Sequence, residues 1–270
     1  METAELKKLC DQVISISEEV GEFIFLERQN FDKARIELKG SKNNLVSYVD
    51  KQAELKIVEK LGELIPEAGF IAEEGTGEAV EGGYNWIIDP LDGTTNFIHN
   101  IPFYSVSIAL MKGDELLLGV IRAICQNETY HAVKGGGAFC NGKAISVSDN
   151  SNLDESLVIT GMPYDSGDKH SLLANFEMIE ALMKESHGFR RFGSAAIDIA
   201  MVASGKADAF YEYGLNAWDL AGGAVILTEA GGIVTDFKGG NDFVFGRQVI
   251  ASSSNFYPTL AALVKKAFLD

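Results

Sequence analysis

The chain has 270 residues, of which 46% are hydrophobic and 23% charged, and its 39 acidic residues outnumber 23 basic ones to give a formal net charge of −16. This composition is typical of a globular protein, long enough for one large domain or two coupled halves. The negative charge argues against nucleic acid or an anionic membrane as a partner, because both select a positive face.

Cysteine usage and the N-terminus bear on the compartment. Cys10, Cys125 and Cys140 are widely spaced and form no CxxC pair, so we expect free thiols and no zinc site or disulfide framework. The first residues lack the pattern of a signal peptide, and no apolar run reaches the ~18 residues of a transmembrane helix. We therefore expect a soluble, cytoplasmic protein.

The first third of the chain combines two predicted helices with acidic residues. Helical spacing of apolar residues predicts helices at 3–28 and 47–65, and the polar segment 39–44 between them predicts an exposed loop. Asp50 lies in the first turn of the second helix, where capping is an alternative to a role in a site. Residues 70–72 predict a strand that ends at Glu73 and Glu74. Since neighbouring strand side chains point to opposite faces, we expect only Glu73 to reach a given metal ion, and a solvated loop is the alternative.

Residues 86–97 are the most informative stretch. Residues 86–88 predict a short buried strand, which Pro90 and Gly93 should end in a turn that carries Asp89 and Asp92. Both carboxylates and the Leu91 carbonyl can then face one point, and such hard oxygen ligands suit Mg²⁺. Gly93, Thr94 and Thr95 offer N–H groups and hydroxyls to an anion where a helix begins. The alternative is that the motif forms only a turn.

Strands are predicted next at 104–111, 116–124, 129–133 and 144–147, with a hairpin turn at 112–114. The glycine-rich segment 135–142 resembles a phosphate-binding loop at first sight, but it lacks the strand-to-helix context and the Lys-Ser/Thr ending of a P-loop, so we predict a hairpin. The polar segment 148–156 is the expected boundary between two halves, 1–148 and 149–270, that together form one compact unit.

The second half alternates strands and helices, which predicts an α/β arrangement with a covered sheet. Strands are expected at 157–161, near 189, and at 207–213, 233–235 and 248–251, and helices at 169–184, 194–203, 218–230 and 255–268. Asp219 begins one of these helices, and capping is the alternative to a site role. Gly222 and Gly223 inside that helix require close packing or a nearby ligand. Glu212, at a strand end, can face the same space.

The acidic residues suggest a reaction if they converge. Clustered carboxylates from Glu73, Asp89, Asp92 and Asp219 would raise one another's pKa values unless divalent cations neutralise them. Two or three Mg²⁺ ions in such a cluster suit displacement at phosphorus. The chain offers no credible Ser-His or Cys-His pair, which agrees with direct attack by water.

The motifs Glu73-Glu74, Asp89-Pro90-Leu91-Asp92-Gly93-Thr94-Thr95 and Trp218-Asp219 with its Ala-Gly-rich helix resemble the inositol monophosphatase family over nearly the whole chain. The resemblance implies a layered α-β-α-β-α fold shared with fructose bisphosphatase and bisphosphate nucleotidase. It also implies magnesium dependence, lithium sensitivity and a homodimer.

The resemblance further implies roles for particular residues. The metal ligands would be Glu73, Asp89, the Leu91 carbonyl, Asp92 and Asp219, with a third ion held loosely by Glu73. Thr94 and Asp50, assisted by Glu73, would orient and deprotonate the attacking water. The groups expected to contact substrate are Asp92, Gly93, Thr94, Thr95, Gly193, Ser194, Ala195, Glu212 and Asp219. Lys39 would lie in a mobile loop that closes near the metals.

Bisphosphate nucleotidases typically carry lysine or another residue where this chain has Thr95, followed by Asn96 and Phe97, so the resemblance favours inositol monophosphate over an adenosine bisphosphate. A carboxylate such as Glu212 can also accept two hydroxyl hydrogen bonds from a polyol. Fructose bisphosphatase, histidinol phosphatase and nucleotidase activities stay open, as does a non-catalytic protein that binds metal or inositol phosphate. The family usually has Asp-Leu-Val-Thr where this chain has Asn44-Leu45-Val46-Ser47, which puts the hold on a third metal in question.

Overall fold

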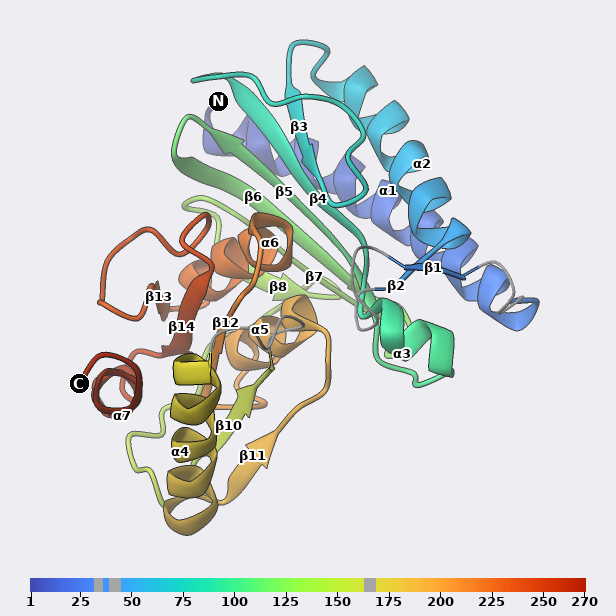
Figure 1. Cartoon of the computed structure of the whole chain (residues 1–270). Helices are drawn as coiled ribbons and strands as arrows, with labels where there is room; N and C mark the ends of the chain where they lie inside the picture. Colours follow the sequence, from blue (N-terminus) through green and yellow to red (C-terminus); the bar gives the residue numbers. More distant parts are fainter. Residues whose placement is uncertain (32–35, 39–44, 163–168) are drawn as a thin grey trace.

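The computed structural model describes residues 1–31, 36–38, 45–162 and 169–270, and its elements form five layers in the order α-β-α-β-α (Figure 1). This arrangement confirms the predicted fold class. A small two-stranded sheet, β1 (Ile36–Leu38) and β2 (Leu45–Ser47), precedes the second helix.

The first large sheet has seven strands in the order β3-β4-β5-β6-β7-β8-β9, of which only the β3–β4 pair is parallel. Its strands are β3 (Gly69–Ala72), β4 (Tyr84–Asp92), β5 (Ser105–Lys112), β6 (Glu115–Ala123), β7 (Glu128–Val133), β8 (Ala138–Cys140) and β9 (Lys143–Ala144). Helices α1 (Thr3–Gln29) and α2 (Tyr48–Leu64) cover one face of this sheet with buried apolar residues that include Leu9, Val13 and Leu61.

The second large sheet has five strands in the order β11-β10-β12-β14-β13. They are β10 (Leu157–Thr160), β11 (Gly188–Arg190), β12 (Ala209–Tyr213), β13 (Gly232–Thr235) and β14 (Gln248–Ser253). Helices α5 (Ala195–Ala203) and α6 (Ala217–Glu229) fill the layer between the two large sheets, and α4 (Lys169–Glu185) and α7 (Tyr257–Phe268) cover the outer face (Figure 1).

Strand β4 corrects one prediction, because it does not end at Asp89 but continues through Pro90 to Asp92. Its pairing with β5 is irregular between Asp89 and Asp92. Proline has no N–H to donate and is tolerated in a strand at such a bulge. Gly93 then adopts φ 95°, a left-handed conformation that favours glycine, and the short helix α3 (Thr94–His99) begins.

The two glycines within α6 serve close packing. A Cβ atom at Gly222 would lie 2.9 Å from Ser107 Oγ on β5, and one at Gly223 would lie 2.8 Å from Ile199 Cγ2 on α5. Both distances are shorter than real Cβ contacts, so α6 approaches its neighbours only because side chains are absent. Of the two reasons that the sequence left open, the structure thus supports packing.

The glycine-rich segment that resembles a phosphate loop binds a carboxylate of the chain itself. The N–H groups of Gly135 and Gly137 donate to the Glu229 side chain at 2.7 and 2.9 Å, and a short strand, β8, follows. The strand predicted at 144–147 is wrong beyond Ala144, where β9 ends and the chain continues without regular structure.

The three cysteines are free thiols, as predicted, with Cys10 buried and the other two half-buried. None of the helices in the described part of the chain combines the length and apolar character needed to span a bilayer.

Candidate active site

A cavity of about 110 Å³ opens between the two large sheets, and acidic side chains from both halves of the chain line it. The residues expected from the sequence that line this cavity are Glu73, Asp89, Leu91, Asp92, Gly93, Thr94, Thr95, Gly193, Ser194, Ala195, Glu212 and Asp219. Lys39 and Asn44 lie outside the described residues.

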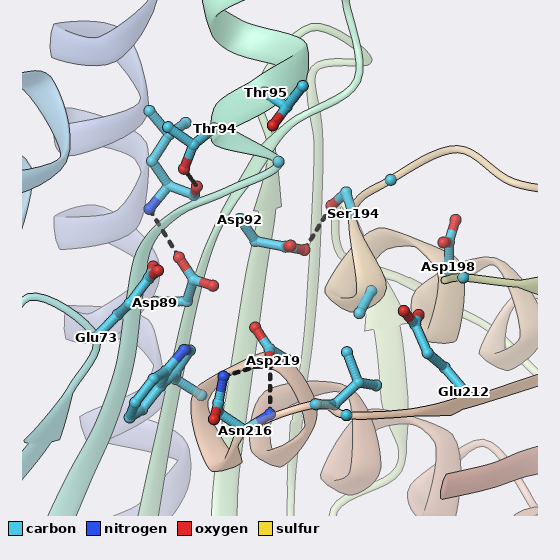
Figure 2. A pocket seen from close by; sticks show the side chains of 18 of the residues that line it. Glu73, Asp89, Asp92, Thr94, Thr95, Ser194, Asp198, Glu212, Asn216 and Asp219 are labelled. Carbon is cyan, nitrogen blue, oxygen red and sulfur yellow. Dashed lines mark hydrogen bonds between the residues drawn. The ribbon is translucent and has the colours of Figure 1, made fainter. Parts of the chain in front are cut away.

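Three carboxylates form the centre of the cavity (Figure 2). Asp89, Asp92 and Asp219 each offer one oxygen, and these oxygens all lie within 4.8 Å of one another. Burial raises the pKa of Asp89 well above its usual range, and the charges of Glu73, Asp92 and Asp219 raise it further. Burial and the charge of Asp92 likewise raise the pKa of Asp219 to about 8. Such mutual repulsion makes the cluster a strong candidate for a cation.

Glu73 follows the end of β3 and lies beside this cluster. Its N–H donates to the Ile88 carbonyl at 3.2 Å, so the parallel pairing of β3 and β4 brings Glu73 next to Asp89. The neighbouring Glu74 N–H donates to the Glu54 carboxylate at 2.7 Å. Glu73, but not Glu74, lines the cavity, and the prediction that Glu73 reaches a metal ion stays a prediction.

Asp219 lies in the first turn of a helix and faces the cavity. Helix α6 begins after Asn216, whose N–H donates to Asp219 Oδ2 at 2.6 Å in a capping box. Asp219 therefore occupies the third position of the helix rather than its cap position. The capping interaction fixes one oxygen, and the cluster with Asp89 and Asp92 uses the same carboxyl group (Figure 2).

Asp92 joins β4 to the start of α5. Its Oδ2 accepts hydrogen bonds from Ser194 Oγ at 2.6 Å and from the Ala196 N–H at 2.9 Å. Burial raises the pKa of Asp92 to about 6, and these hydrogen bonds act in the opposite direction. The charged form of Asp92 is thus better supported than that of Asp89.

Thr94 and Asp50 form a hydrogen-bonded pair at the other wall. Thr94 Oγ1 lies 2.9 Å from Asp50 Oδ1 and 3.1 Å from the Leu91 carbonyl oxygen. Asp50 Oδ2 meanwhile accepts hydrogen bonds from the N–H and the hydroxyl of Ser47, the residue that caps α2. Asp50 therefore takes part in capping α2 and also contacts a residue of the cavity. A capping role and a role in the site, which were alternatives for Asp50 in the sequence, are thus compatible.

The cavity is also lined by residues that the sequence did not single out, which are Gly161, Met162, Arg191, Asp198, Gly214, Leu215 and Asn216. Asp198 is 1% exposed, and its Oδ1 has no hydrogen-bond partner in the described structure. Burial and the charge of Glu212 raise the pKa of Asp198 well above its usual range. Burial also raises the pKa of Glu212 to about 8, with the charge of Asp219 adding to it and Arg191 opposing it.

Two of these residues carried a signal in the sequence. An aspartate in the otherwise apolar helix Ala195–Ala203 is unusual, because acids are rarely buried without a partner. Asn216 stands three residues before Asp219, which is the spacing of a capping box. Gly161 and Met162 carried no comparable signal, because their place beside the cavity depends on strand pairing between distant segments.

Comparison with known proteins identifies the group to which this arrangement belongs. The model of the inositol monophosphatase family matches residues 5–268. The chain belongs to the inositol monophosphatase family.

Individual members of the inositol monophosphatase family are similar over nearly their whole length. An inositol monophosphatase of Dictyostelium discoideum is 36% identical over 98% of this chain and 97% of its own. A fructose-1,6-bisphosphatase/inositol-1-monophosphatase of Thermotoga maritima is 36% identical over 95% of each chain. The crystal structure of the extragenic suppressor protein SuhB of Bartonella henselae superposes with a TM-score of 0.89 at 35% identity, over 96% of this chain and 99% of that one.

Membership makes this protein a phosphatase of a metal-dependent family, and the residues present fit that description. Three carboxylates with oxygens within 4.8 Å of one another, two of them buried and that of Asp219 half-buried, supply the hard oxygen ligands that divalent cations select. The family does not by itself select one substrate, because similar chains carry the names of different phosphatases.

Proposed function

We propose that this protein is a magnesium-dependent phosphomonoester hydrolase that acts on inositol 1-phosphate through direct attack by water. The observation that carries the proposal is the group of carboxylates from Asp89, Asp92 and Asp219 beside the hydrogen-bonded pair of Thr94 and Asp50. The three carboxylates can bind cations, and Thr94 and Asp50 can accept a proton from water.

The residues that would hold two to three Mg²⁺ ions are Glu73, Asp89, the carbonyl of Leu91, Asp92 and Asp219. Bound Mg²⁺ supplies Lewis-acid activation of water and neutralises phosphate charge. The carboxylates of the chain fix the ions and, once neutralised, no longer repel one another. Inhibition by lithium is part of this proposal, because the same family resemblance that suggested the metal ligands also implies lithium sensitivity.

Thr94 and Asp50 would orient the attacking water and take up its proton. The Thr94 hydroxyl has one proton, which it can donate to Asp50 Oδ1 at 2.9 Å, and its lone pairs can then accept a hydrogen bond from water. Transfer of the water proton to Thr94 and of the Thr94 proton to Asp50 leaves a hydroxide ion and a neutral Asp50 carboxyl group, so the total charge is conserved. Glu73 lies near enough to the cluster to assist as a base.

The phosphate would be received by the N–H groups of Gly93 and Thr94 and by the Thr95 hydroxyl. The polyol would then extend toward Gly193, Ser194, Ala195 and Glu212 at the other end of the cavity. Fructose bisphosphate is the second candidate substrate, favoured by the double name of the Thermotoga relative and by Arg191, a cationic residue among those that line the cavity, which could meet a second phosphate. Adenosine bisphosphates are less favoured, because Thr95 stands where bisphosphate nucleotidases typically carry another residue, and histidinol phosphate stays an alternative.

A homodimer and a cytoplasmic location complete the proposal. Helix α4 exposes the large apolar side chains of Leu173, Phe176 and Met183, of which each is more than half exposed, and association would cover them. Light scattering coupled to size-exclusion chromatography tests the dimer, with a single monomer peak as the contrary result. Free thiols at all three cysteines agree with a reducing compartment.

The decisive experiment measures phosphate release from inositol 1-phosphate, fructose 1,6-bisphosphate, histidinol phosphate and 3′-phosphoadenosine 5′-phosphate, each with Mg²⁺, with chelator and with lithium. We expect Mg²⁺-dependent turnover that is fastest on inositol 1-phosphate and is inhibited by lithium. The Asp89→Asn variant should lose turnover while it retains the folded circular-dichroism spectrum, because the side-chain volume is kept and a charge in the cluster is removed. Absence of Mg²⁺-dependent turnover on every substrate would favour a non-catalytic binding protein.

A further inference from the structure

The carboxylate of Glu212 rests on the backbone of Gly161. Strands β10 and β12 are parallel neighbours, and their last recorded pair is Thr160 with Tyr211. Gly161 directly follows the end of β10 and Glu212 is the next residue of β12, so they lie side by side at the wall of the cavity. A Cβ atom at Gly161 would overlap Cδ and both oxygens of the Glu212 carboxylate.

Glycine at this position is required by space and not by backbone conformation. The φ angle of Gly161 lies outside the left-handed range, so an L-residue can adopt the same backbone there. The three atoms nearest to such a Cβ all belong to the carboxylate of Glu212, at 2.0 to 2.1 Å. Any side chain at residue 161 must therefore move Glu212 or move the backbone.

Buried hydrogen bonds hold the backbone of Gly161 in place. Asn175 Nδ2 donates to the Gly161 carbonyl at 3.2 Å, and the Tyr211 hydroxyl donates to Asn175 Oδ1 at 2.8 Å. Asn175 and Tyr211 are both 0% exposed, so breaking this chain would leave buried polar groups without partners. A side chain at residue 161 should therefore displace the Glu212 side chain rather than the backbone, because the Glu212 side chain can rotate about several bonds.

We propose that Gly161 is a positioning residue for substrate selection: its missing side chain lets Glu212 lie back against the wall, which leaves the cavity wide enough for a ring polyol. The inference rests on the proposed function, in which Glu212 accepts hydroxyl hydrogen bonds. Asp198 closes the same end of the cavity on another side (Figure 2), so a displaced Glu212 carboxylate moves into the space where the ring would bind.

The test compares Gly161→Ala with the wild-type enzyme on inositol 1-phosphate and on glycerol 2-phosphate, a small substrate without ring hydroxyls. We expect KM for inositol 1-phosphate to rise about tenfold, the loss of one hydrogen bond to a charged acceptor, with kcat changed less than about twofold. KM for glycerol 2-phosphate should hardly change. Equal losses of kcat on both substrates would overturn the inference.

A double-variant comparison separates positioning from a general structural effect. In the Glu212→Ala background there is no carboxylate to displace, so adding Gly161→Ala should leave KM unchanged. A tenfold rise in that background would mean that Gly161 does not act through Glu212. Gly62→Ala is the matched control, since a Cβ atom there meets only Phe70 Cζ at an ordinary 3.9 Å, and it should alter neither constant.

A crystal structure of Gly161→Ala tests the geometry without any assay of activity. We expect the Glu212 carboxylate to leave its place while the hydrogen bond between Asn175 and residue 161 persists. A carboxylate that stays in place over a shifted backbone would refute the positioning role. If the wild-type enzyme hydrolyses no phosphomonoester, the proposed function fails, and the crystal structure still decides the positioning role.

Discussion

The substitution Asp219→Asn should stabilise the metal-free protein at neutral pH. Asp219 has a pKa of about 8 in the folded protein against 3.8 in the unfolded chain, because of burial and the charge of Asp92. A folded-state pKa raised above the unfolded value means that stability present below pH 4 is lost as the pH rises from about 4 to about 8. Asparagine carries no charge, so the variant escapes this loss.

The magnitude follows from the size of the pKa change. At pH 7 the carboxylate would cost about 4 kcal/mol at 1.36 kcal/mol for each pKa unit between 3.8 and 7. Asp219 is only half-buried, and its partners can take up a proton instead, so we expect about 2 kcal/mol. The amide oxygen of asparagine can still accept the Asn216 N–H, which preserves the cap of α6.

Urea unfolding in chelator at pH 4.5, 7 and 8, at constant ionic strength, measures the effect. The variant should exceed wild type by about 2 kcal/mol at pH 7 and by little at pH 4.5, as the linkage argument requires. Saturating Mg²⁺ should stabilise wild type more than the variant, because one ligand is missing. Asp114→Asn, at the exposed turn between β5 and β6, is the control and should change nothing. A variant less stable than wild type in chelator at pH 7 would refute the account of the cluster.

Three further predictions concern single contacts. Thr94→Ala should lower kcat by about 100-fold or more, whereas Thr94→Ser should keep most of the activity, because serine retains the hydroxyl that donates to Asp50. Steady-state kinetics at saturating Mg²⁺ measure both variants, and equal activities of the two would contradict this prediction. Gly222→Ala should destabilise the protein by about 1–3 kcal/mol in urea unfolding, since its Cβ atom would lie 2.9 Å from Ser107 Oγ, and a neutral or stabilising effect would contradict the packing described for α6. Glu229→Gln should lower the free energy of unfolding by about 1 kcal/mol, because the N–H groups of Gly135 and Gly137 lose a charged acceptor, and an unchanged value would argue against that contact.

Local patterns in the sequence predicted most elements of the fold. The apolar spacing in α1 and α2 and the alternation of strands and helices after residue 157 correspond to the observed elements within a few residues. Strand β4 departed from its prediction because the bulge beside Pro90 depends on pairing with β5, which lies beyond the reach of a local pattern. Strand β9 is shorter than predicted for a similar reason, since pairing with β8 ends at Ala144.

The residues of the candidate site likewise divide into those that local patterns predicted and those that depend on pairing between distant segments. Asp89 and Asp92 could be placed together from their spacing, whereas the convergence of Asp219 from the other half of the chain was a supposition to which the family resemblance then gave a ligand role. The structure brings these three carboxylates together, while their roles as metal ligands stay proposals. Gly161 could not be found from the sequence, because its contact with Glu212 arises from the parallel register of β10 and β12, which are separated by α4, β11 and α5.

The hydrogen bonds of Asp92 have a mechanical consequence. One carboxyl group belongs to the acidic cluster at the end of the first large sheet and also holds the start of α5, in the layer next to the second sheet. Cation loading favours the charged form of Asp92, which strengthens both of these hydrogen bonds. Mg²⁺ should therefore slow hydrogen exchange at the Ala196 amide. The ion would stabilise the contact between the first large sheet and α5 as well as prepare the cavity for its substrate.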